Sequence, residues 1–119
     1  MAASTEEVLN HHLQAFGEGN LEAILADYTE DSILCTQDGV LEGLDEIRPF
    51  FESFFAEFAK PGASFGMDRQ TVRGELAFIA WHAETADRVI ELGTDTFIVR
   101  DGKIVAQTFA AKTTAKSVS

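Results

Sequence analysis

Apolar residues recur at helical spacing in the first half of the chain. Ser4 and Glu7 match a capping box, in which two side chains satisfy amides at a helix start, and the positions that follow predict a helix from about Ser4 to Gly17. At about 100° per residue, His12 falls within the apolar arc and is expected to point inward. Asn20 can cap a second, short helix, whose apolar face runs from Leu21 to Tyr28.

A stripe of phenylalanines gives the strongest helical signal. Asp45 is a candidate cap of this third helix, and Lys60-Pro61-Gly62 ends it. We interpret the stripe as core packing, with one or two rings lining a pocket. Before it, residues 32–36 and 40–42 predict two short strands. The apolar members of the stripe are Ile47, Phe50, Phe51, Phe54, Phe55 and Phe58.

The pattern changes to strands from Ser64 onward. An Asp101-Gly102 step predicts a tight hairpin between the last two strands, because glycine tolerates the positive φ that such turns require. Ala77 to Trp81 carries apolar residues on both faces, which predicts a sheet covered on both sides, by helices on one and by a second subunit on the other. The layout is therefore α+β. Its long strands are expected at residues 64–73, 76–84, 88–100 and 103–112.

Length and charge limit the function classes. The 119 residues predict a single domain spanning 1–119. With 20 acidic and 9 basic residues, the net charge of -11 disfavours binding to nucleic acid or to an anionic membrane. A lone cysteine, Cys35, excludes an intrachain disulfide. We see neither a signal peptide nor a membrane-spanning run, and expect a soluble, cytoplasmic protein.

Asp95 is the first candidate for function, since it lies inside a predicted strand. Aspartate is disfavoured in strands and costly to bury without a partner. Strand alternation places it on the same face as Phe97 and Val99. Gln107 is expected to face inward from the next strand, either to bind a ligand carbonyl or to be satisfied by backbone. Trp81 and His82 lie on opposite strand faces, and either one could face the interior.

Several segments together resemble the nuclear transport factor 2 superfamily, and in particular its bacterial SnoaL-like branch. The resemblance implies a cystatin-like cone, in which three N-terminal helices pack in a curved mixed, mostly antiparallel sheet, as in ketosteroid isomerases. It is specific for the fold rather than the function, because its members include isomerases, cyclases, dehydratases and epoxide hydrolases. The matching segments are Phe16–Ile24, Asp27–Ser32, Gly39–Gly43 with Ile47 and Phe50-Phe51, Thr94–Phe97 and Asp101–Ile104.

The register of the ketosteroid isomerases carries candidate roles to single positions. In that register, His12 replaces the tyrosine that stabilises an oxyanion, and Asp95 matches the aspartic acid that does the same. Tyr28 matches a supporting tyrosine, and Phe51 replaces another. Thr36 stands where those enzymes have their catalytic base, and a hydroxyl cannot abstract a carbon-bound proton unaided. Ordinary ketosteroid isomerisation is therefore not expected.

These observations predict a pocket for a small hydrophobic molecule that bears a carbonyl or hydroxyl group. His12 and Asp95 would form an acid–base site of isomerase, cyclase or dehydratase type, and as a hydrogen-bonded charged pair they would keep His12 protonated. The alternative is a non-catalytic ligand-binding or dimeric assembly domain in which the pair is structural. No metal is expected, since His11 and His12 project apart, and no cofactor is expected, since the sequence has neither a glycine-rich phosphate loop nor a dinucleotide-binding fingerprint. The expected ligand-binding residues are Tyr28, Thr36, Phe51, Phe55, Trp81 and Gln107.

Overall fold

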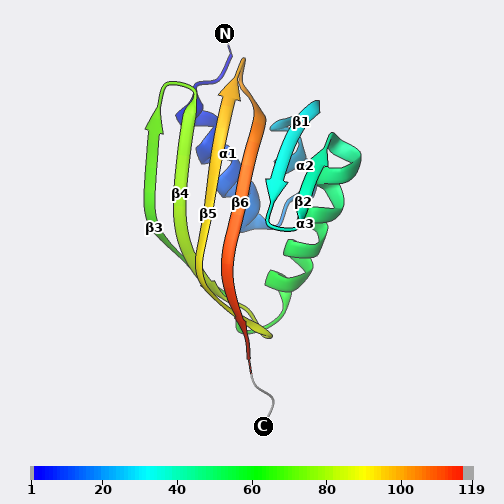
Figure 1. The fold of residues 1–119 in the computed structure, drawn as a ribbon, viewed down its shortest axis with the longest axis vertical. Helices are drawn as coiled ribbons and strands as arrows, with labels where there is room; N and C mark the ends of the chain where they lie inside the picture. The colour runs from blue at the N-terminus through cyan, green and yellow to red at the C-terminus, as the bar shows by residue number, and fades with distance from the viewer. Residues whose placement is uncertain (1, 117–119) are drawn as a thin grey trace.

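The computed structural model describes residues 2–116 (Figure 1). Side chains cap the first two helices. The predicted capping box is present, with Ser4 Oγ accepting from the Glu7 amide. Asn20 Oδ1 likewise accepts from the Ala23 amide at the second helix. The elements are α1 (Thr5–Glu18), α2 (Leu21–Leu25), β1 (Tyr28–Thr36), β2 (Gly39–Glu42), α3 (Leu44–Ala59), β3 (Ser64–Arg73), β4 (Leu76–Glu84), β5 (Arg88–Arg100) and β6 (Lys103–Ala115).

The strands form one curved sheet in the order β2-β1-β6-β5-β4-β3 (Figure 1). All neighbours are antiparallel except β1 and β6, which run parallel and make the sheet mixed. The predicted hairpin joins β5 to β6, and both of its turn residues have positive φ, 52° at Asp101 and 77° at Gly102. That geometry explains why an Asp-Gly step stands there.

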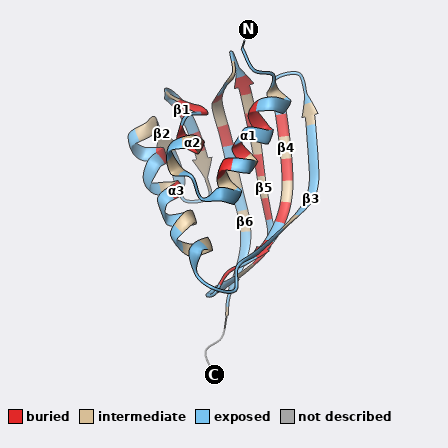
Figure 2. Cartoon of the chain, turned by 180° about the vertical axis from the view of Figure 1, so that it is seen from behind, coloured by how far each residue is buried: buried red, intermediate tan, exposed pale blue. Residues whose placement is uncertain are grey.

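The helices cover one face of the sheet and leave the other face open (Figure 2). Along β5 the inner positions Asp95, Phe97 and Val99 are buried, whereas Thr96 and Ile98 on the outer face are partly exposed. The predicted α+β cone, with three helices packed in a mixed sheet, is confirmed. No helix among residues 2–116 has the length and apolarity needed to cross a membrane.

Two local predictions are wrong. Tyr28 begins β1 rather than ending α2, because the chain here pairs with β6: Tyr28 lies opposite Ile104, whose amide donates to the Asp27 carbonyl. This long-range pairing overrides the helical spacing of Tyr28. Asp45 does not cap α3, since the N-cap is Gly43 at φ 80°, where a side chain would be strained.

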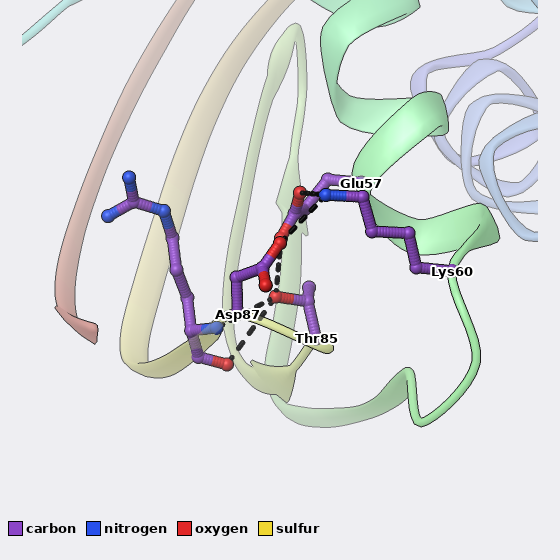
Figure 3. Close-up of polar contacts among 5 residues, drawn as sticks. Glu57, Lys60, Thr85 and Asp87 are labelled. Carbon is purple, nitrogen blue, oxygen red and sulfur yellow. Dashed lines mark hydrogen bonds and ion pairs between the residues drawn. The ribbon is translucent and has the colours of Figure 1, made fainter. Parts of the chain in front are cut away.

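A polar cluster fixes the C-terminal end of α3 to the turn between β4 and β5 (Figure 3). Thr85 is completely buried; its Oγ1 donates to Glu57 Oε1 over 2.9 Å and accepts from the Arg88 amide over 3.1 Å. On the solvent side, Lys60 Nζ bridges Glu57 and Asp87 at 3.2 and 2.7 Å. Helix and sheet are thus held together at this end.

Candidate functional site

A small cavity lies between α1, α3 and the inner face of the sheet. Its volume is about 40 Å³, room for roughly three water molecules. Most of its wall is aromatic, and Asp95 and His12 are the titratable groups in it. The lining residues are His12, Leu13, Phe16, Phe50, Phe51, Phe54, Phe65, Ile79, Trp81, Asp95, Gln107 and Phe109.

Trp81 faces this cavity, whereas His82 is on the outer face of the sheet and bonds Asp68 at 2.9 Å. The indole of Trp81 lies directly over Gly93, its neighbour across the β4–β5 ladder. A Cβ added to Gly93 would be only 2.4 Å from Cε2 and Cζ2 of that indole. A glycine at this position therefore lets the ring lie against the backbone of β5.

Asp95 is held by two neutral donors. Trp81 Nε1 donates to Oδ1 over 2.8 Å, and Gln107 Nε2 donates to Oδ2 over 2.9 Å. The hydroxyl of Tyr28 in turn donates to Oε1 of Gln107. All four side chains are at most 7% exposed. The chain of donors from β1, β6 and β4 ends on one carboxylate, which matches the acceptor-only character of an ionised aspartate.

Burial raises the pKa of Asp95 to about 6, although the hydrogen bonds from Trp81 and Gln107 act in the opposite direction. The group is therefore mostly ionised at neutral pH and close to its titration midpoint. A carboxylate with such a pKa can both take and return a proton under physiological conditions. Burial and the charge of Asp95 also raise the pKa of Tyr28 well above its ordinary value, so this hydroxyl stays neutral.

His12 is buried among aromatic rings. Its imidazole makes edge contacts with Tyr28, Phe51 and Phe97 at centroid distances of 6.0, 5.9 and 5.1 Å. Its Nδ1 is fully enclosed and has no hydrogen-bond partner within residues 2–116. Burial, and to a lesser degree the charge of His11, lowers the pKa of His12 to about 3. The ring is therefore neutral at physiological pH.

The expected charged pair of His12 and Asp95 does not form. Within the described residues, no hydrogen bond or ion pair joins the two side chains, because Asp95 takes its donors from Trp81 and Gln107. Without that pair nothing keeps His12 protonated, and the dry aromatic surroundings lower its pKa. Both groups nevertheless line the same cavity, one as a carboxylate and one as a neutral imidazole.

Only some of the other predicted site residues line the cavity. Phe51, Trp81 and Gln107 line the cavity, and Tyr28 reaches it through Gln107. Thr36 lines a separate shallow hollow beside β2, and its Oγ1 donates to the Gly39 carbonyl. Phe55 packs against Phe16 and Phe51 outside the cavity wall.

Several lining residues were not predicted. Phe65 and Phe109 flank Trp81 on the inner face of the sheet, with ring centroids 5.4 and 6.2 Å from the indole. Alternation with Gln107 did place Phe109 inward, which was a usable signal. Phe65 gave none, because it lies near the start of an edge strand and is 46% exposed. Phe16 was named only as the first residue of a segment that resembles the superfamily, without a place in the pocket.

The donor set of this site does not resemble a metal centre. Among residues 2–116, no three His, Cys, Asp or Glu side chains are arranged to hold a metal ion. The second buried carboxylate, Asp27, is outside the cavity and bonds Nδ1 of His11 at 2.7 Å. It offers a matched comparison for Asp95, because burial raises its pKa too.

Solved structures with the same fold share little sequence with this chain. SalBIII, an epoxide hydrolase/cyclase-like enzyme of pyran ring formation in salinomycin, superposes with a TM-score of 0.77 at 18% identity, covering 94% of this chain and 95% of its own. An NTF2-like protein of unknown function from Mesorhizobium loti gives 0.77 at 20% identity, covering 91% and 90%. A de novo designed protein with a curved β-sheet gives 0.75 at 16% identity, covering 91% and 84%. At such identities the likeness shows the fold alone.

Sequence comparison identifies the family more directly. No curated protein matches the chain significantly. The SnoaL-like domain model, however, matches residues 9–107, which include most of α1, all of the elements from α2 to β5, the start of β6 and every polar residue of the cavity. This chain belongs to the SnoaL-like domain family.

Proposed function

We propose that the cavity binds a small, largely apolar molecule with a carbonyl or hydroxyl group, and that Asp95 moves a proton on it. The observation that carries this proposal is a carboxylate in an aromatic cavity, held by two neutral donors, with its pKa raised to about 6. A base with a pKa near the working pH combines a useful ionised fraction with a strong tendency to accept a proton.

The two polar groups would have different tasks. An ionised Asp95 only accepts hydrogen bonds, so it would face a hydroxyl or a C–H group next to a carbonyl. A neutral imidazole carries one N–H, so His12 would donate to the carbonyl oxygen as charge develops there. Asp95 would take the proton from the substrate and return it at another atom, as an isomerase, cyclase or dehydratase reaction requires. Asp95 thus takes the role of the base that Thr36 cannot fill.

Cavity size favours small substrates. A volume of about 40 Å³ is well below the several hundred Å³ of a typical drug-sized site. Steroid-sized molecules would need several of the lining phenylalanine side chains to move. We therefore propose substrates of a few heavy atoms at the reacting end, such as small ketones or 1,3-diketones.

Proton exchange tests this proposal directly. The protein should speed the exchange of α-protons for deuterium in butanone or acetylacetone, followed by ¹H NMR in D₂O. The rate should rise with pH through about 6, as Asp95 ionises. Asp95→Asn should lower the protein-dependent rate by roughly 100-fold or more, because general-base catalysis contributes about that much.

Asp27→Asn is the matched control, since it removes a buried carboxylate that lies outside the cavity. It should leave the exchange rate unchanged. Equal loss in both variants would point to a general effect on the fold, and exchange that survives in Asp95→Asn would rule out Asp95 as the base.

A second candidate function is a non-catalytic binding or assembly domain. The same hydrogen bonds around Asp95 support it if their role is structural. Through them, side chains from four strands are connected, namely Trp81, Asp95, Gln107 and Tyr28. On that reading, Asp95→Asn would change stability, and the protein would not speed proton exchange in any small carbonyl compound. The exchange experiment therefore separates the two candidates.

A further inference from the structure

The carboxylate of Asp95 is buried without a cation. Its two partners, the indole of Trp81 and the amide of Gln107, are neutral. Buried charges in proteins are ordinarily paired with an opposite charge, because neutral donors recover only part of the lost hydration. None of the cavity-lining residues is a lysine or arginine, and burial keeps His12 from supplying a charge.

The cavity groups that remain free to form hydrogen bonds are mainly acceptors. Gln107 uses one Nε2 hydrogen to donate to Asp95 and one lone pair of Oε1 to accept from Tyr28. The single indole N–H of Trp81 is used as well. What remains is the free lone pairs on the Asp95 oxygens, one N–H and one lone pair on Gln107, and the imidazole of His12, which has one N–H and one acceptor nitrogen. A ligand that satisfies Asp95 must therefore donate.

The walls present aromatic faces to such a donor. Phe65, Trp81 and Phe109 are neighbours on the inner face of the sheet. The ring planes of Phe65 and Trp81 differ by 30°, and those of Trp81 and Phe109 differ by 14°. One face of the Trp81 indole covers Gly93, so its other face is turned away from the sheet. Faces of aromatic rings attract cations, and tryptophan does so most strongly.

We propose that this cavity is a binding site for a small organic ammonium ion. The ammonium group would donate to Asp95 and lie against the face of Trp81, with its methyl or methylene groups among the phenylalanines. A volume of about 40 Å³ fits two or three heavy atoms, as in methylammonium or dimethylammonium. The net charge of -11 would raise the local concentration of cations around the chain.

This ligand class goes beyond the proposed proton transfer, because binding an ammonium ion needs the charge of Asp95 but no reaction. It needs an ionised Asp95, a neutral His12 and a neutral Tyr28. Those are the titratable groups that reach the cavity from β5, α1 and β1, while the lining residues of α3 are all phenylalanines.

Matched ligands test the proposal. Methylammonium, dimethylammonium and the neutral methanol and 2-propanol would be titrated into ¹⁵N-labelled protein at pH 8, following the indole N–H of Trp81. The ammonium ions should shift this signal saturably and bind at least ten-fold more tightly than the alcohols. Trp81→Phe would remove the reporter, so its binding would be measured by calorimetry, and it should be several-fold weaker.

Two comparisons isolate the charge. Asp95→Asn should abolish the preference for ammonium over alcohol, whereas Asp27→Asn should keep it. If Asp95→Asn does not fold, the wild type at pH 5 replaces it, since protonation of Asp95 should weaken ammonium binding while alcohol binding stays constant. Equal affinity for ammonium and alcohol, or a preference that persists in Asp95→Asn, would overturn the proposal.

The outcome is independent of catalysis. Exchange of ketone protons without ammonium binding would overturn this inference and leave the proposed function standing. Ammonium binding without any proton exchange would support this inference and overturn the proposed function.

Discussion

The absence of a side chain at Gly93 lets the indole of Trp81 lie next to Asp95. Gly93 has an ordinary extended φ, so its backbone would accept alanine, and only the overlying ring of Trp81 forbids the Cβ. Gly93→Ala should push the indole away and break its bond to Asp95. The pKa of Asp95 should then rise further above about 6, because a contact that lowers it is lost. Titration of the Asp95 carboxyl by ¹³C NMR measures this shift.

Gly66→Ala is the control for that substitution. Gly66 lies opposite His82 across the β3–β4 ladder, and an added Cβ would be 2.4 Å from Cε1 of His82. This ring is exposed on the outer face, so it can turn into solvent at little cost. The pKa of Asp95 should stay unchanged. Identical titration curves for wild type and Gly93→Ala would show that Gly93 does not position Trp81.

The charge of Asp95 costs stability at neutral pH. Its folded pKa of about 6 is above its ordinary 3.8, so its contribution to folding is complete below about pH 4 and is lost as pH rises through 6. Asp95→Asn should therefore be more stable than wild type at pH 8, by up to about 3 kcal/mol, and equal to it near pH 4. Urea unfolding at both pH values measures the difference.

His12 makes the stability of the fold depend on pH in the opposite direction. Its pKa of about 3 is below the ordinary 6.5, so its contribution is present above pH 6.5 and is lost as pH falls through 3. His12→Phe should therefore be less sensitive to acid than wild type, as midpoints of thermal unfolding between pH 7 and pH 4 would show. An acid response identical to wild type would contradict a buried, neutral His12.

At the level of elements, local patterns predicted most of what was local. Capping residues, the phenylalanine stripe and the Asp101-Gly102 turn each act over a few residues, and each gave its element within a few residues of its ends. Tyr28 was misplaced because its pairing with Ile104 spans most of the chain. The hydrogen bonds around Asp95 could not be predicted for the same reason. Strand alternation showed which faces Asp95 and Gln107 lie on, but it did not show which side chains they bond.

The cluster at the end of α3 gives an element-scale prediction. Thr85→Val keeps the shape of a completely buried side chain but removes its bonds to Glu57 and the Arg88 amide. Unfolding should become easier by about 1–2 kcal/mol, because buried polar groups lose their partner. Lys60→Met removes only solvent-exposed ion pairs and should change stability little. Urea unfolding compares the two, and equal effects would mean that the buried bonds contribute nothing.

At the level of the whole molecule, the sequence could not predict the size of the cavity. Periodicity shows which residues point inward, but the space left between them depends on how rings from α1, α3 and four strands interlock. Six phenylalanines and one tryptophan fill most of the cone, which leaves only about 40 Å³. The pocket expected for a small hydrophobic molecule therefore has room for only a few heavy atoms.

The open face of the sheet leads to the last prediction, a homodimer. Its outer positions include Leu76 and Leu92, which are 43% and 47% exposed, and Ile33, which is 38% exposed. Exposed apolar side chains on a sheet face that no helix covers are typical of an interface between copies. Light scattering at micromolar concentration should therefore give about twice the chain mass of 13.0 kDa.

A substitution that adds a charge should dissociate this dimer only if it lies in the interface between the copies. Leu92→Glu places a carboxylate on the outer face, and in a dimer each copy would bury it against an already acidic partner. The mass should fall to that of one chain. Gln14→Glu adds the same charge on the exposed side of α1 and should leave the dimer intact. A wild-type protein that is monomeric at every concentration would instead mean that the outer face stays in water.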